Sequence, residues 1–155
     1  ELEMGAVGFH AHNNLGLAVS NSLQAIVSGA TVIDGTCMGF GAGAGNASME
    51  LIIANLHQIG ASSAASLQNY LYLVEHVASK FDISSPDLSP LSIVTGTKGI
   101  FSGFARQIRQ AAFENQVSWL DLCEELGRYE TVAGQEDLIF EIAATMARNN
   151  VKRSD

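Results

Sequence analysis

The sequence predicts an α/β protein, in which two parallel strands with their helices are followed by a mainly helical region. Residues 7–12 and 31–36 are short runs that fit buried strands, and apolar residues recur at helical spacing along 15–28 between them. Strand, helix and strand within about 30 residues form a βαβ unit, whose strands are parallel and joined by a right-handed crossover. Beyond residues 82–90, which contain both prolines, the strand signal disappears.

The composition supports this class and excludes several others. The 155 residues are 47% hydrophobic and only 15% charged, which excludes a disordered chain. A net charge of −8 argues against a nucleic-acid-binding surface. No apolar run is long enough to span a bilayer, and the start Glu-Leu-Glu-Met lacks the basic region of a signal peptide, so we expect a cytoplasmic protein without a membrane partner. Cys37 and Cys123 lack metal-type spacing and are expected to be free thiols.

The elements of the first half follow in order. A strand over 7–12 leads into a helix over 15–28, which Gly29 ends in the usual C-terminal position. The β-branched run 31–36 is the second strand. A glycine-rich segment then leads into a helix over about 47–59.

The second half contains the predicted domain boundary. An amphipathic helix begins near Leu67, and the Pro/Ser-rich segment 82–90 follows it as a linker. This predicts two domains, 1–80 and 81–155. Ser89-Pro90 looks like an N-cap followed by proline at the first helical position.

Three further helices are expected after that start. Ser118 and Asp121 resemble a capping box that opens a short helix ending at Gly127. The last helix is expected to begin near residue 135 and to end at about Arg148. The predicted apolar stripes are Phe104, Ile108 and Ala111 in the first of these helices and Leu138, Ile142 and Met146 in the last.

His10 and His12 are the first candidates for a functional site. Side chains two apart in a strand point to the same face, so both imidazoles project together while Phe9 and Ala11 face the packed side. Two imidazoles aimed at one point can hold a divalent metal and leave positions open for oxygen ligands. The alternative is a chance pair, with one histidine solvated and the other in the core.

The segment 39–46 is the second candidate. Its alternating glycines precede a helix and can present backbone N–H groups to an anion or an oxygen ligand, although neither phosphate-loop pattern is matched. A plain tight turn is the alternative. Asn46 is either an ordinary N-cap or a residue whose amide oxygen faces a metal.

These motifs together resemble a known family. The segments GFHAHNNLGLAV (8–19), IDGT (33–36) and GAGAGNA (41–47) are similar to the end of the barrel in the metal-dependent lyase and aldolase superfamily that includes 3-hydroxy-3-methylglutaryl-CoA lyase. Three later segments narrow the resemblance to 4-hydroxy-2-oxovalerate aldolases, namely FSGF (101–104), ELGR (125–128) and VAGQEDLI (132–139). The resemblance implies the last two βα units, with strands 7 and 8, of a TIM (β/α)₈ barrel, followed by a small helical communication domain.

The resemblance also implies a cofactor, a partner and site residues. His10 and His12 match the two histidine metal ligands, and Asn46 matches an asparagine that helps to bind metal in the CoA-lyase branch. Asp34 lies on what would be strand 8. The expected metal is Mn²⁺, with Mg²⁺ or Co²⁺ as alternatives, and the expected products are pyruvate and a short aldehyde. The helical domain is expected to dock an acylating acetaldehyde dehydrogenase.

The sequence departs from the family pattern in two ways. The Arg-Asp-Gly segment that supplies the third metal ligand and the catalytic arginine does not precede Glu1, so we expect a C-terminal part of a longer aldolase that is inactive alone. An active-site tyrosine of the family aligns with Phe101, which keeps the ring and loses the hydroxyl. The alternative for Phe101 is simple packing beside Phe104.

Two rival functions stay open from the sequence. One is a Claisen-type CoA lyase or synthase of the same superfamily, which the QEDLI tail (135–139) disfavours. The other is a non-catalytic docking module, formed by the helical region with a vestigial barrel edge.

Overall fold

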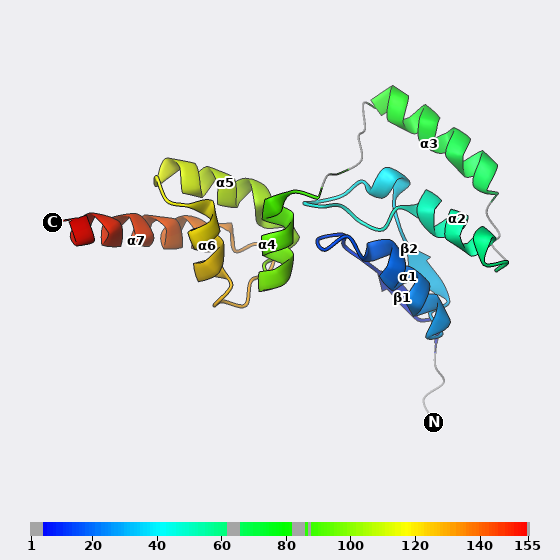
Figure 1. Cartoon of the computed structure of the whole chain (residues 1–155), viewed down its shortest axis with the longest axis horizontal. Helices are drawn as coiled ribbons and strands as arrows, with labels where there is room; N and C mark the ends of the chain where they lie inside the picture. Colours follow the sequence, from blue (N-terminus) through cyan, green and yellow to red (C-terminus); the bar gives the residue numbers. More distant parts are fainter. Residues whose placement is uncertain (1–4, 62–65, 82–85, 87, 155) are drawn as a thin grey trace. The chain divides into compact units, whose positions relative to one another are not determined.

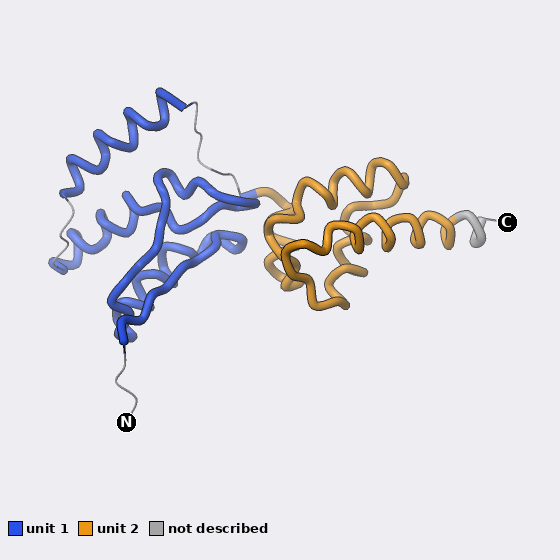
Figure 2. The backbone as a smooth tube through the Cα atoms, turned by 180° about the vertical axis from the view of Figure 1, so that it is seen from behind, with its two compact units in different colours: residues 1–88 blue, residues 89–155 orange. Residues whose placement is uncertain are grey.

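The computed structural model describes residues 5–61, 66–81, 86 and 88–154, and it divides into two compact units. Unit 1 comprises residues 1–88 and unit 2 comprises residues 89–155 (Figure 2). Of the predicted 82–90 linker, residues 82–85 and 87 lie outside the described part.

Unit 1 begins with the predicted βαβ unit, and this prediction is confirmed. Strand β1 (Gly8–His10), helix α1 (Ala18–Val27) and strand β2 (Val32–Asp34) follow one another (Figure 1). The two strands are parallel, and Phe9 pairs with Ile33 and His10 with Asp34. Both strands are shorter than predicted.

Helix α1 begins three residues later than the sequence predicted. Residues 14–16 form a turn, and the side-chain oxygen of Asn13 accepts a hydrogen bond from the backbone N–H of Ala18 at 3.2 Å. Leu15, which was expected on the buried helical stripe, is therefore outside the helix and 49% exposed. Gly29 follows the helix with a positive φ of 102°, as predicted.

The rest of unit 1 consists of a 3₁₀ turn and two helices. The turn η1 (Cys37–Gly39) follows β2. Helices α2 (Met49–Gln58) and α3 (Leu67–Phe81) come after the glycine-rich segment 39–46, called the glycine loop below. Ser48, rather than Asn46, is the N-cap residue of α2, so the N-cap interpretation of Asn46 is wrong.

The core of unit 1 lies on one face of the two strands. Its buried residues lie directly after β1, in α1, just before α2 and in α2, and Phe9 and Ile33 pack against them from the strands. These buried residues are Ala11, Ala18, Ala47 and Ile52. The side chains at His10 and Asp34 point to the opposite face, because alternate residues of a strand project to opposite sides.

All regular elements in the described part of unit 2 are helices. Ser89 caps the first helix, since its hydroxyl accepts from the N–H of Ser92 with proline at the first helical position, as predicted. Ser118 caps another helix in the same way by accepting from the N–H of Asp121. The elements are α4 (Pro90–Lys98), η2 (Ser102–Phe104), α5 (Ala105–Glu114), α6 (Trp119–Leu126) and α7 (Glu136–Ser154).

The core of unit 2 joins all four α-helices. Phe104, Ile108 and Ala111 are buried as predicted. Helix α7 runs past the predicted end at Arg148. Of its predicted stripe, Ile142 is buried, whereas Leu138 and Met146 pack at the edge of the cluster; its most deeply buried residues are Ile139 and Ala143. Buried members from the other helices include Leu91, Leu122, Cys123 and Leu126.

Within the part of the chain that is described, no helix combines the length and the apolar character that a membrane crossing requires.

Candidate functional site

The two histidines of the first motif lie side by side. His10 ends β1 and His12 follows it beyond the buried Ala11, and both imidazoles are exposed. Their ring centroids are 5.0 Å apart and the ring planes meet at 79°. The backbone therefore places both rings beside each other at the carboxyl end of the strand, where parallel α/β proteins bind their ligands. Their role as metal ligands stays a prediction.

Asn46 is joined to the same site by the backbone. His12 and Asn46 form an isolated antiparallel bridge, in which the N–H of Asn13 donates to the carbonyl of Gly45 at 2.8 Å and the N–H of Ala47 donates to the carbonyl of Ala11 at 3.0 Å. His12 and Asn46 are thus the non-hydrogen-bonded pair of this antiparallel bridge. In such a pair the Cα atoms are typically about 4.5 Å apart and both side chains project to the same face. Residues 34 positions apart in sequence are brought together in this way.

The glycine loop holds Asn46 in place through two close approaches. Gly45 has a φ of +81°, and a Cβ there would collide with the carbonyl oxygen of Gly39. A Cβ at Gly41 would collide with the side-chain amide of Asn46. A side chain at either position would displace the loop or the amide, so close packing explains why Gly41 and Gly45 are glycines.

The two ends of the Asn46 amide differ. Nδ2 donates to the carbonyl oxygen of Phe40 at 3.0 Å, whereas Oδ1 is buried and has no hydrogen-bond partner among the described residues. A buried polar atom without a partner is costly unless something else binds it. An amide oxygen is a suitable ligand for a hard divalent cation, so this observation fits a metal bound nearby.

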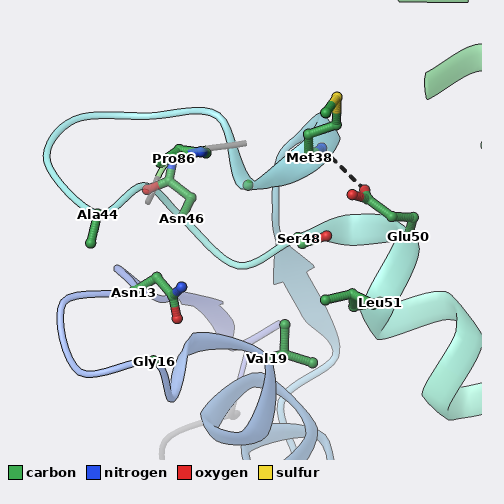
Figure 3. Close-up of a pocket in the computed structure, with 11 residues that line it drawn as sticks. Asn13, Gly16, Val19, Met38, Ala44, Asn46, Ser48, Glu50, Leu51 and Pro86 are labelled. Atoms are coloured by element: carbon green, nitrogen blue, oxygen red, sulfur yellow. Dashed lines mark hydrogen bonds between the residues drawn. The ribbon is translucent and has the colours of Figure 1, made fainter. Parts of the chain in front are cut away.

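A cavity of about 470 Å³ adjoins this loop in unit 1. Figure 3 shows Asn13 and Val19 on one side of it, Ala44, Asn46 and Ser48 on the other, and Glu50 near its end. The carboxylate of Glu50 accepts a hydrogen bond from the backbone N–H of Met38 at 3.2 Å, which fixes the turn after β2. The cavity combines polar and apolar walls and is large enough for a small organic acid.

Asp34 is a site residue whose role the sequence reasoning missed. Its Oδ2 lies 2.9 Å from Nδ1 of His10, directly across the parallel pair. The signal was present in the sequence as an acid at the end of the second strand, but the link needs the strand register. Near β2, burial and then the Glu50 carboxylate raise the pKa of the Cys37 thiol, which disfavours the thiolate form that binds metals.

The described residues supply only part of a metal site. No group of three or more His, Cys, Asp and Glu side chains among them is arranged to hold a metal ion. Two exposed imidazoles and one unpartnered amide oxygen fit a mixed nitrogen and oxygen ligand set that leaves the remaining coordination positions to other groups.

Phe101 lies in unit 2, where it precedes η2. Its ring meets the ring of Phe104 edge to face, with centroids 5.2 Å apart, and it is 36% exposed. Its backbone N–H donates to the hydroxyl of Thr131 at 3.0 Å. The ring is therefore anchored on one side by packing and is open on the other.

Comparison with known families divides the chain in two. Residues 2–77 match the HMGL-like family, and residues 86–148 match the DmpG-like communication domain. A solved structure, the N-terminal domain of a "putative aldolase" from Bacteroides vulgatus, is similar with a TM-score of 0.56 and 29% identity, over 72% of this chain and 37% of that chain.

Curated relatives agree with these matches. The 4-hydroxy-2-oxovalerate aldolase of Pectobacterium atrosepticum is 45% identical over 93% of this chain and 42% of its own length. The enzyme of the same name from Spirochaeta aurantia is 48% identical over 88% of this chain and 40% of its own length. The chain thus spans about two fifths of the length of the curated relatives it matches. One family model matches each half of the chain, and both of these relatives carry the same name, so the chain is similar over most of its length to the C-terminal part of 4-hydroxy-2-oxovalerate aldolases of the HMGL-like superfamily.

Proposed function

We propose that this chain is the C-terminal part of a divalent-metal aldolase that cleaves 4-hydroxy-2-oxo acids to pyruvate and a short aldehyde. The observation that carries the proposal is the pair of adjacent imidazoles of His10 and His12 at one strand end, with Asn46 bridged to His12 through the backbone, in a chain whose relatives are named for this activity. The rest of the catalytic machinery is expected in the remainder of the full-length protein.

In this proposal β1 and β2 are the last two strands of a (β/α)₈ barrel. Such a barrel needs about 250 residues, so two strands with their helices are one part of it. The strands are parallel, their helices pack on the face of Phe9 and Ile33, and the polar residues His10 and Asp34 occupy the other face. This arrangement matches a barrel, where helices cover the outside and polar residues at the strand ends line the active site.

The chain's own residues would hold the cation and orient the substrate. His10 and His12 would each give one imidazole nitrogen, and Asn46 would add its amide oxygen, which has no other partner among the described residues. A bound divalent cation supplies Lewis-acid stabilisation of the negative charge that develops on a 2-oxo acid when its carbon–carbon bond breaks. The mixed ligand set favours Mn²⁺ over a closed structural zinc site.

The test is a coupled assay on the complete gene product. Purified protein with Mn²⁺ is expected to release pyruvate from 4-hydroxy-2-oxovalerate without coenzyme A, and a chelator should abolish the activity until Mn²⁺ is restored. A strict requirement for a CoA thioester would instead establish the Claisen-type rival, and turnover unaffected by chelation would contradict the metal assignment.

We further propose that unit 2 docks an acylating acetaldehyde dehydrogenase. The match of residues 86–148 to a communication domain supports this. Ending the full-length protein after Leu88, at the boundary between the units, is expected to abolish co-purification with the dehydrogenase encoded beside it. Mn²⁺ content serves as the control for an intact unit 1. Undiminished co-purification of the shortened protein would contradict the docking role.

Phe101 is proposed to act on substrate stereochemistry, at the position of the family tyrosine. Its partly exposed ring supports contact with a ligand better than full burial would. Restoring the hydroxyl by Phe101→Tyr adds a potential hydrogen bond of about 0.5–1.5 kcal/mol, which corresponds to at most about a tenfold change in discrimination. We therefore expect the ratio of kcat/KM for the two C4 enantiomers to change more than the rate of cleavage. A ratio unchanged within about twofold would mean that Phe101 only packs.

A further inference from the structure

The pairing of Asp34 with His10 has a chemical consequence for the proposed site. Nδ1 of His10 and Oδ2 of Asp34 are 2.9 Å apart, a normal distance for a charge-assisted hydrogen bond. The pair is set by the backbone, because His10 and Asp34 are direct neighbours in the parallel register. A carboxylate has no proton to give, so the hydrogen bond requires the proton to be on Nδ1 of the imidazole.

The neutral imidazole has one N–H and one lone pair, and the position of the proton decides which nitrogen can bind a cation. With the proton on Nδ1, the lone pair is on Nε2. We propose that Asp34 is a positioning residue that holds His10 in this tautomer, so that Nε2 is the metal-binding nitrogen. The inference rests on the proposed metal role of His10 and deepens it.

The geometry also favours a role for Asp34 in orientation over one in stability. The side chains of His10 and Asp34 are 42% and 66% exposed, and an exposed polar pair of this kind contributes little to the stability of a fold. The T-shaped contact with the His12 ring restricts the orientation of the His10 imidazole on one side, and the hydrogen bond to the Asp34 carboxylate restricts it on another. Carboxylates that orient metal-binding histidines in this way typically change metal affinity by about 10–100-fold when they are removed.

The first measurement reads the tautomer in the metal-free full-length protein, labelled with ¹⁵N-histidine. Long-range ¹H–¹⁵N spectra are recorded at about pH 8.5, above the usual imidazole range near 6.5. Loss of signals in His10→Ala identifies His10. The expected result is an Nδ1–H tautomer for His10 that shifts toward Nε2–H in Asp34→Ala. A predominant Nε2–H form in the parent protein, or a tautomer that Asp34→Ala leaves unchanged, would overturn the inference.

The second measurement is the dissociation constant for Mn²⁺, followed by electron paramagnetic resonance. Asp34→Asn keeps the shape of the side chain but can donate to Nδ1 from its amide, so it releases the constraint on the tautomer. We expect it to weaken Mn²⁺ binding about 10–100-fold. Glu75→Gln is the matched control, because it removes the charge of an exposed carboxylate on α3. It should leave the affinity for Mn²⁺ unchanged.

The outcomes separate this inference from the proposed function. If His10→Ala weakens Mn²⁺ binding and Asp34→Asn stays within about twofold of the parent, Asp34 does not position the ligand, while the metal role of His10 stands. If neither variant weakens Mn²⁺ binding, the inference about Asp34 and the proposed metal role of His10 are both wrong. A weaker affinity without a shift of the tautomer would also overturn the inference, because the carboxylate would then act only through its charge.

Discussion

Replacing His10 or His12 by alanine in the full-length protein is expected to lower kcat/KM by about a hundredfold or more. Each variant removes one of two imidazoles that lie with ring centroids 5.0 Å apart at the strand end. Lewis-acid stabilisation is worth several kcal/mol at the transition state, and each 1.36 kcal/mol corresponds to about a factor of ten in rate. Metal content, measured on the same samples by mass spectrometry, should fall together with activity.

The chain provides its own control for this experiment. His76 is an exposed histidine on α3, and His76→Ala removes an imidazole without touching the strand end. It should retain both metal and turnover. Measurement over a wide range of Mn²⁺ concentrations distinguishes weaker binding from lost chemistry. Full turnover with stoichiometric metal in either His10→Ala or His12→Ala would show that the ligand assignment is wrong.

The order of elements could be predicted from the sequence because it depends on local patterns. The β-branched run before Asp34 and the spacing of apolar residues in α1 predicted a parallel βαβ unit, and β1 and β2 are parallel. The caps at Ser89 and Ser118 were visible for the same reason, since each satisfies a backbone N–H three residues away. The start of α1 was missed because Asn13 competes as a local acceptor and delays the helix to Ala18.

The site could be predicted only in part. The sequence singled out His10, His12 and Asn46, but not the bridge that pairs His12 with Asn46 or the register that sets His10 against Asp34. Both contacts join residues more than 20 positions apart, so no local pattern encodes them. The buried Oδ1 of Asn46 likewise depends on how the glycine loop folds back.

Unit 2 illustrates a different limit. Of the three residues in the predicted stripe of α7, Ile142 is buried, whereas Leu138 and Met146 lie at the edge of the core. Ile139 and Ala143, which were not in the predicted stripe, are fully buried. Apolar residues of both registers are present on this helix, and which row is buried depends on the neighbouring helices α5 and α6. Periodicity identifies a helix more reliably than it identifies the centre of its buried face.

Replacing Phe104 by alanine is expected to produce the largest loss of stability among the single substitutions considered for unit 2. Phe104 is 1% exposed in the main core cluster, and its ring contacts the ring of Phe101. Truncating a buried phenylalanine to alanine typically costs about 3–5 kcal/mol, through lost transfer energy and the cavity that remains. Phe113→Ala on α5 is the matched control, because Phe113 is 85% exposed and its loss should cost less than about 0.5 kcal/mol.

Cys123 offers a probe for this prediction inside the same core. Its side chain is fully buried, and burial followed by the Glu124 carboxylate raises the pKa of its thiol to about 11, so alkylation at neutral pH requires the core to open. A loss of about 3 kcal/mol increases the opening equilibrium about a hundredfold or more. Alkylation of the Cys123 peptide, followed by mass spectrometry on the full-length protein, should accelerate by that factor in Phe104→Ala and not in Phe113→Ala. Equal labelling rates in Phe104→Ala and the parent would show that Phe104 does not hold this core closed.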